Sequence, residues 1–364
     1  MTINDYVKKY NYSFEEKPFN EVDNLVFATL AYLKLYKYID KNEKITIGEL
    51  QRRYLQSDEA KSKKIFATSC ACKLLESIST KRFKDVALYN YVYESDDYSQ
   101  FGAVTFDLGN TLYIAYEGTD ELVSGWEEDF EMAYTFPVLA HKKAINYAKK
   151  YTFTRKKIIL GGHSKGGNLA LVAGMQSNFI LKNKIKAIYS NDGQGLRKTE
   201  LESTKYKSIE DKYIHLIPQN SIVGLLFRHK NDIVVKSNAL MLFSHIPSSI
   251  LIEDDHFIRT ELVGASKIFD EGMTVWLDKY NYEQRKYFVK EVFNVFRENG
   301  IVSILELRTN YNKLIKVMKS SSKVSDKTKE MFNDLLQIFN KIRKEKIVKI
   351  VNATKNIHFE TENW

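Results

Sequence analysis

The sequence contains little cysteine and proline and no long apolar run. Its two cysteines, Cys70 and Cys72, stand too close together for a four-ligand zinc site or a disulfide framework. Four prolines and sixteen glycines in 364 residues form no flexible linker, so domain boundaries must be inferred from changes of pattern. No stretch approaches the roughly 18 uninterrupted apolar residues of a membrane-spanning helix. We therefore expect a soluble protein with both cysteines buried.

Charge and composition restrict the classes of partner. The net charge of +9 comes from 55 basic residues mixed among 46 acidic ones, a pattern typical of a solvated surface, and no nucleic-acid partner is expected. The basic segment 341–350 leaves open a peripheral contact with an anionic membrane. The first 24 residues lack the apolar stretch of a signal peptide, which favours a cytoplasmic location.

The first third of the sequence changes from helical to strand-like patterns. Residues 21–37 have apolar positions at helical spacing, with Asn20 or Asp23 available as the N-cap, and residues 47–80 indicate further short helices. From about residue 86 the runs are rich in β-formers, and Gly109 with Asn110 provides a turn between two strands. We expect a helical lead-in followed by a hairpin.

The remaining sequence predicts an α/β unit and then helices. From about residue 138, helical stretches alternate with short apolar runs, which predicts a central, mostly parallel sheet. After residue 266 only helical patterns remain, including Asn281 and Gln284 at capping-box spacing. We therefore predict an α/β domain at 1–265, which includes the helical lead-in, and a helical cap or appendage at 266–364.

One motif indicates nucleophilic chemistry. Gly162-His163-Ser164-Lys165-Gly166 matches G-x-S-x-G and lies between the β-like run KIILG and the helical run NLALVAG. This is the context of a nucleophile elbow, which is typical of the α/β-hydrolase fold and exposes the serine hydroxyl on a strained turn. The main-chain N–H of Lys165 would then face the oxyanion of a tetrahedral intermediate, with the Lys165 side chain on the surface.

A second oxyanion donor is expected after an earlier strand. The run LYIAY leads into Gly118 and Thr119, where the hydroxyl or N–H of Thr119 could donate and the small Gly118 leaves room for a carbonyl. The alternative is an ordinary turn at the end of a strand.

These motifs resemble known families. IAYEGTDELVSGWEEDF and LGGHSKGGNLALVAG are similar to class 3 lipases, and PFNEVDNLVFATLAYL, GHSKGGNLA, YSNDGQG and IPQNSIVG resemble a family of uncharacterised bacterial proteins called Mbeg-like. The second resemblance extends over nearly the whole chain. It implies an α/β-hydrolase fold with lipase or esterase activity.

The sequence departs from the lipase pattern at two positions. Glu117 stands where those families usually have arginine, and Asn220 with Ser221 occupies the position of the triad acid. Trp126 and Asp129 also match family positions, and we interpret them as a buried aromatic residue and a capping carboxylate.

The base of a triad is expected after the serine and the acid. His245 follows the last β-like run, VVKSNALMLF, and matches the histidine position of the resembled family, whereas His256 is the alternative. The other histidines precede the serine or lie in a strand, a charged turn or the tail.

For the acid, the best replacement is Asp192 in YSNDGQG, at the end of the preceding strand. An Asx-turn is the competing explanation of this residue. Asp232 and Asp255 are poorer candidates, and a Ser-His dyad is also open.

The expected function is that of a serine hydrolase that cleaves a carboxylic ester, with a lipid or hydrophobic acyl group as substrate. No metal or organic cofactor is implied. The alternative is a hydrolase-like scaffold that binds a protein partner or an acyl ligand without turnover, which Glu117 and Ser221 favour.

Overall fold

A computed structural model describes residues 1–40, 42–61, 66–96, 99–119, 123–299 and 324–361. Its centre is an eight-stranded sheet whose strands lie in chain order, β1 to β8. The first four strands pair antiparallel and β4 to β8 pair parallel, which confirms the predicted mostly parallel sheet and the hairpin between β3 and β4. The strands are β1 (Ile45–Thr46), β2 (Ala87–Ser95), β3 (Gln100–Asp107), β4 (Thr111–Tyr116), β5 (Lys157–His163), β6 (Ile185–Asn191), β7 (Tyr213–Pro218) and β8 (Ile233–Val235).

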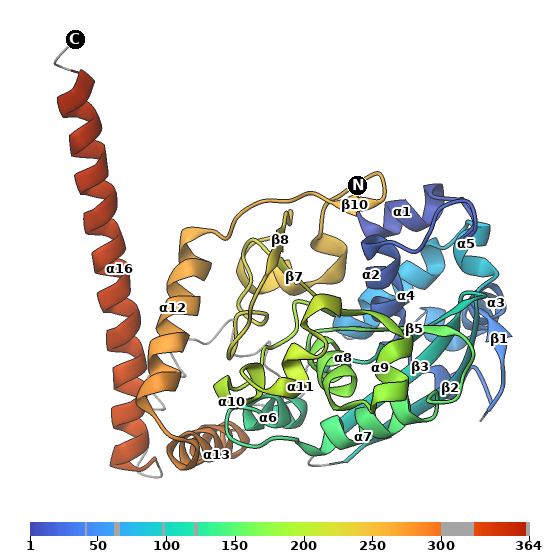
Figure 1. Cartoon of the computed structure of the whole chain (residues 1–364), viewed down its shortest axis with the longest axis horizontal. Coiled ribbons are helices and arrows are strands. Elements are labelled where there is room, and N and C mark those ends of the chain that lie inside the picture. The colour runs from blue at the N-terminus through green and yellow to red at the C-terminus, as the bar shows by residue number, and fades with distance from the viewer. Residues whose placement is uncertain (41, 62–65, 97–98, 120–122, 300–323, 362–364) are drawn as a thin grey trace.

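Both faces of the sheet are covered (Figure 1). Side chains alternate along a strand, and in β4 Tyr113 joins one hydrophobic cluster while Leu112 and Ile114 join the other. The first cluster contains the N-terminal helices, and the second contains α7 and α8. The helical elements up to β6 are α1 (Ile3–Lys9), α2 (Glu21–Leu30), η1 (Leu35–Lys37), α3 (Ile47–Gln56), η2 (Asp58–Lys61), α4 (Phe66–Ser77), α5 (Lys81–Lys84), α6 (Val123–Glu131), α7 (Leu139–Lys149), α8 (Lys165–Gln176) and α9 (Phe179–Lys184).

The predicted lead-in and hairpin are confirmed. Asn20 is the N-cap of α2, because its side chain accepts hydrogen bonds from the N–H groups of Val22 and Asp23. Gly109 adopts a φ of 82° between β3 and β4, a conformation that favours glycine. Cys70 and Cys72 are buried free thiols, as expected.

The last predicted strand is shorter than its sequence pattern. β8 ends at Val235, and the following residues turn instead of extending the strand. Ser237 is responsible in part, because its hydroxyl accepts a hydrogen bond from the N–H of Ala239 and donates one to Ser249 Oγ. The chain then passes through η4 (Met241–His245), η5 (Pro247–Ser249), β9 (Ile252–Glu253) and β10 (His256–Phe257).

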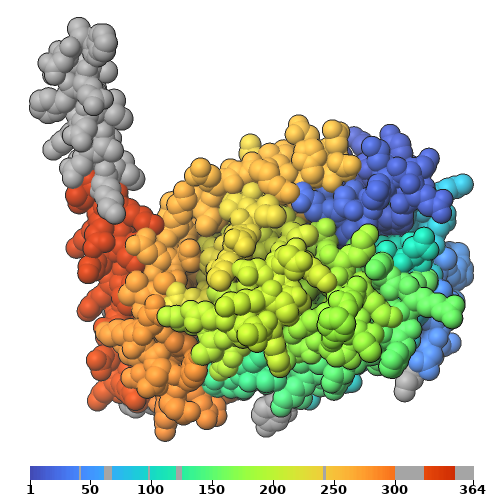
Figure 2. Space-filling view, viewed as in Figure 1, coloured from blue at the N-terminus to red at the C-terminus, as the bar shows by residue number. Residues whose placement is uncertain are grey.

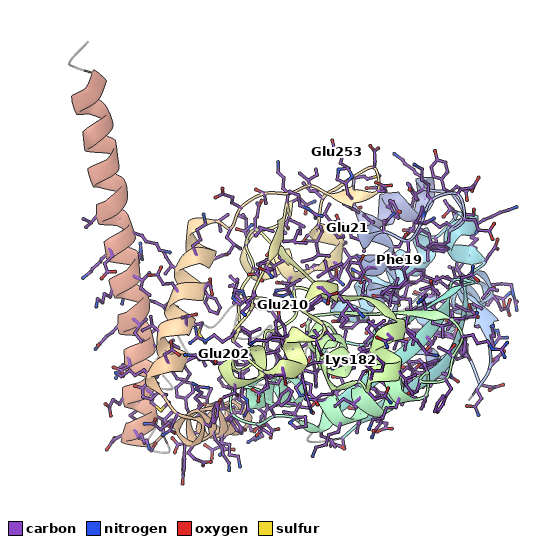
Figure 3. The ribbon with its side chains drawn as sticks, in the orientation of Figure 1. Phe19, Glu21, Lys182, Glu202, Glu210 and Glu253 are labelled. Atoms are coloured by element: carbon purple, nitrogen blue, oxygen red, sulfur yellow. The ribbon has the colours of Figure 1, made fainter. Side chains whose placement is uncertain are left out.

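The β9–β10 hairpin lies against the N-terminal α2. Glu21 at the start of α2 and Glu253 in β9 are labelled in Figure 3. The Glu21 carboxylate accepts a hydrogen bond from the Phe257 N–H at 2.7 Å and forms an ion pair with Arg259 at 2.6 Å. These contacts join segments that are more than 230 residues apart in the sequence.

Helices follow the sheet, and the capping box at Asn281 and Gln284 is confirmed. Met273 and Trp276 of α12 and Met331 of α16 belong to the same hydrophobic cluster as the sheet residues, while α16 extends away from the body in Figure 1. The predicted helical residues 300–323 lie outside the described residues, and the division at 265 stays a prediction. The remaining helical elements are α10 (Lys198–Leu201), α11 (Thr204–Lys207), η3 (Glu210–Lys212), α12 (Gly264–Lys279), α13 (Tyr282–Glu298) and α16 (Asp326–Thr361).

This arrangement is an α/β-hydrolase fold: a mostly parallel sheet with a strand, tight turn and helix at Ser164. None of the helices in the described part of the chain has the length and hydropathy needed to cross a lipid bilayer.

Candidate active site

Ser164 lies on the turn that joins β5 to α8. Its φ of 57° and ψ of −133° fall outside the regions that side-chain-bearing residues favour, which is the strained geometry of an elbow. Two glycines make this turn possible. A Cβ at Gly162 would lie 2.2 Å from the carbonyl carbon of Gly166, and one at Gly166 would lie 2.1 Å from the carbonyl oxygen of Tyr116. The motif glycines therefore allow the close contact of strand, turn and helix.

His245 and Asp192 meet beside this turn. Asp192 follows β6, whose Asn191 pairs with His163 of β5, so Asp192 and Ser164 leave the sheet at the same edge. Nδ1 of His245 lies 2.6 Å from Oδ2 of Asp192. The described residues include no hydrogen bond between Ser164 Oγ and His245, and such bonds are often long in unliganded enzymes.

Asp192 receives two more hydrogen bonds. Ser221 Oγ donates to its Oδ1 at 2.5 Å, and the Gly224 N–H donates to the same atom at 3.0 Å. Burial alone would raise the pKa of Asp192, but the hydrogen bonds from His245 and Ser221 outweigh burial and hold the pKa below its usual value. Asp192 is therefore a carboxylate at neutral pH, and His245 Nδ1 carries the hydrogen of this pair.

His163 holds the main chain of His245. Its Nε2–H donates to the His245 carbonyl at 2.7 Å, so its Nδ1 is the acceptor that faces the Tyr32 hydroxyl at 2.9 Å. Burial, followed by the charge on His245, lowers the pKa of His163 to about 3. His163 is therefore a neutral ring, packed 4.4 Å from the His245 ring centroid.

On the other side of the elbow, Thr119 Oγ1 donates to Asp129 Oδ2 at 2.8 Å. Asp129 lies inside α6 and accepts a further hydrogen bond from Gln194 at 3.3 Å, so our interpretation of Asp129 as a capping carboxylate is wrong. Because the Thr119 hydroxyl hydrogen is directed to Asp129, the main-chain N–H of Thr119 is the group left for an oxyanion. Burial raises the pKa of Asp129 to about 7, against the opposing charge of Lys165.

The Lys165 side chain is buried, not on the surface as the sequence suggested, and only 1% of it is exposed. Its ammonium pairs with Glu128 of α6 and donates to the main-chain oxygen of Gln100 at 3.2 Å. These partners explain the burial, because a buried charge requires a counter-charge. The Lys165 N–H is among the first N–H groups of α8, which have no acceptor within the helix.

The negative charge of Glu117 is balanced by a nearby lysine. Its side chain is buried and forms an ion pair with Lys34 at 2.6 Å. Lys34 in turn lies over the ring of Tyr93 at 4.0 Å. The charge that replaces the usual arginine is thus balanced by a lysine from the N-terminal region.

A family model described as Mbeg1-like matches residues 77–294. The chain belongs to the Mbeg1-like family. Among solved structures, this Mbeg1-like chain is similar to the Rhizomucor miehei lipase propeptide complex, with 12% identity and a TM-score of 0.34 over 58% of this chain and 66% of that one. It is also similar to lipase II from Rhizopus niveus, with 15% identity and a TM-score of 0.34 over 59% and 77%. No curated protein sequence gives a significant match.

The other histidines of the Mbeg1-like chain have different surroundings. His256 has a half-exposed side chain on the β9–β10 hairpin, beside the carboxylates of Glu253 and Asp255. His215 is buried, with Nδ1 2.8 Å from Asp232. The residues that sequence reasoning missed are His163 as a support for His245, Tyr32 behind it, and Ser221 as a donor to Asp192. The sequence could have indicated Ser221, because this residue occupies the position expected for the triad acid.

Proposed function

We propose that this Mbeg1-like protein is a serine hydrolase that cleaves carboxylic esters, with Ser164 as nucleophile, His245 as base and Asp192 as orienting acid. The observation that carries the proposal is the 2.6 Å contact between His245 Nδ1 and Asp192 beside the strained Ser164 turn. The hydrolase-like scaffold alone would not require a buried carboxylate to face an imidazole at that point.

The reaction follows from these positions. Ser164 Oγ attacks the ester carbonyl carbon while His245 Nε2 accepts the hydroxyl proton, and Asp192 stays ionised and stabilises the imidazolium. The N–H groups of Lys165 and Thr119 would donate to the oxyanion. His245 then gives its proton to the departing alcohol, and a water molecule activated by the same imidazole releases the acid from the acyl-serine.

The alternative is a scaffold that binds a partner or acyl ligand without turnover. It was favoured by the two departures at Glu117 and Ser221. Ser221 donates to Asp192, and Glu117 is paired with Lys34, so both departures have compensating partners. This complementarity supports the enzyme over the scaffold.

A hydrophobic acyl group is the proposed substrate feature. Leu240 is 71% exposed and Phe243 is 51% exposed, and both lie within five residues of His245. Exposed apolar side chains beside the candidate base would contact an acyl chain. We expect Leu240→Ser to raise KM for a long-chain p-nitrophenyl ester by several-fold and to leave KM for the acetate unchanged. Equal effects on both esters would remove the argument for an acyl contact.

The central test is intact mass spectrometry after treatment with a fluorophosphonate probe. Wild type and His256→Ala should gain one adduct, and Ser164→Ala and His245→Ala should gain none. Circular dichroism of all four proteins checks that they are folded. Absence of labelling in folded wild type would leave the binding scaffold as the better explanation.

A further inference from the structure

A cavity of about 450 Å³ lies where the C-terminal helices meet the hydrolase body. Its walls are the end of α12 and the start of α13, the segment 196–199, and Phe227 with Arg228. Figure 1 shows α10, α12 and α13 close together, and in Figure 2 the orange helices meet the yellow-green segment on this side of the molecule. The volume is within the range of small-molecule sites. None of the candidate catalytic residues lines the cavity.

The lining of this cavity is strongly basic. One carboxylate, that of Asp278, faces five cationic side chains: those of Arg197, Lys198, Arg228, Lys279 and Arg285. Outside the lining, Glu200 pairs with Arg197, and Asp334 pairs with Lys279. Five cations against three carboxylates leave two positive charges without a counter-charge among these residues.

Aromatic and hydrogen-bond contacts hold the three arginine guanidinium groups of this cavity in place. Arg197 and Arg285 lie over the ring of Tyr282, at 4.7 and 5.2 Å from its centroid. Arg228 donates to Asp278 at 2.6 Å and to a main-chain oxygen of α12 at 3.1 Å. The aromatic ring and these bonds fix the orientation of the arginines in advance of any ligand.

Of the three arginines that line the cavity, Arg285 is the one whose positive charge has no carboxylate partner among the described residues. It donates to the main-chain oxygens of Ala133 and Leu277 and forms no ion pair with any described carboxylate. Its Nε is buried and has no hydrogen-bond partner among the described residues. Burial lowers the pKa of Arg285, and the neighbouring Arg228 and Arg197 lower it further, as expected where cations crowd together.

We propose that this cavity binds a small molecule that carries a phosphate monoester. Planar guanidinium forks match phosphate oxygens in geometry and charge. A phosphate monoester carries between about 1.5 and 2 negative charges at neutral pH, which equals the uncompensated charge of the cavity. The phosphate could belong to a soluble metabolite or to a lipid headgroup. The proposal does not depend on ester hydrolysis, so Ser164→Ala should bind the same ligand with unchanged affinity.

The test uses the full chain at 0.15 M salt. Glycerol 3-phosphate binding is measured by calorimetry, and vesicle binding is measured with phosphatidic acid in phosphatidylcholine against phosphatidylcholine alone. Arg228→Gln should weaken binding about 10-fold or more, because a charge-assisted hydrogen bond is lost. Asp278→Asn should tighten binding, because it removes the carboxylate of the lining. Arg52→Gln, which removes an exposed and ion-paired arginine on α3, is the matched control and should change nothing.

Glycerol 3-phosphate and phosphatidic acid vesicles together distinguish a soluble ligand from a lipid headgroup. Binding of glycerol 3-phosphate indicates a soluble ligand, and binding of phosphatidic acid vesicles alone indicates a headgroup, provided that both pocket variants act in their stated directions. The proposal is overturned if neither probe binds, or if Arg228→Gln and Asp278→Asn behave like Arg52→Gln. Loss of binding in Arg52→Gln would also overturn it, since attraction to the basic surface would then explain the result.

Discussion

The two sides of the Ser164 turn each contain a buried aspartate, and the pKa values of the two are shifted in opposite directions. Asp192 has a lowered pKa, while the pKa of Asp129 is raised to about 7. Asp192 has three donors at 2.5 to 3.0 Å, from His245, Ser221 and Gly224. Asp129 has donors on one oxygen only, and its Oδ1 has no hydrogen-bond partner among the described residues. Burial raises the pKa of both carboxyl groups, and the difference in hydrogen-bond donors and neighbouring charges explains why only that of Asp192 is lowered.

The largest effect on activity is expected on the side of the Ser164 turn that contains His245 and Asp192. Asp192→Asn should lower kcat for an ester about 10⁴-fold, because an amide does not hold His245 in the required tautomer. Steady-state kinetics measures the loss, and circular dichroism shows whether the fold is retained. A loss below about 10-fold would mean that the site works as a dyad.

On the oxyanion side, Thr119→Val should lower kcat about 10²-fold. Valine preserves shape and the main-chain N–H but loses the bond to Asp129 that fixes the donor. Thr119→Ser is the matched control and should retain most activity. If Thr119→Val were as active as wild type, the hydroxyl bond to Asp129 would not be needed to position the Thr119 N–H.

A smaller effect is expected from Ser221→Ala, which removes one donor from Asp192 and leaves the Gly224 N–H. We expect kcat to fall about 10-fold. The pKa of Asp192 should rise towards its usual value, which an infrared titration of its carboxyl group would measure. An Asp192 pKa equal to that of wild type would show that Ser221 does not tune the carboxylate.

The smallest effect is a difference in stability on the Asp129 side. Its pKa is about 7 in the folded protein and near 3.8 when unfolded. The folded state therefore binds a proton before the unfolded state does, and stability is gained as pH falls from about 7 towards 4. Asp129→Asn should remove this gain, which we expect to be a few degrees in Tm between pH 8 and pH 5. Parallel Tm profiles for the two proteins would contradict a raised pKa.

The sequence predicts the framework well because local patterns determine it. Turn glycines, the alternation of apolar residues and the Asn20 cap were enough to place the sheet, the hairpin and the elbow. The site was harder, since its contacts are long-range. The Asp192–His245 bond joins residues 53 apart, and the partners of Lys165 come from β3 and α6. A lysine after the serine gave no sign of its own burial, which depends on Glu128. The cytoplasmic location and the membrane contact of segment 341–350 stay predictions.

The backbone of Ser164 has a consequence for the stability of the fold. Its φ and ψ suit glycine, and a serine held there costs about 1–3 kcal/mol of folding free energy. Ser164→Gly should therefore raise the free energy of unfolding above that of Ser164→Ala while removing the hydroxyl, as chemical denaturation would show. A hydroxyl at this turn is therefore held at a cost in folding stability, which the proposed nucleophile would account for.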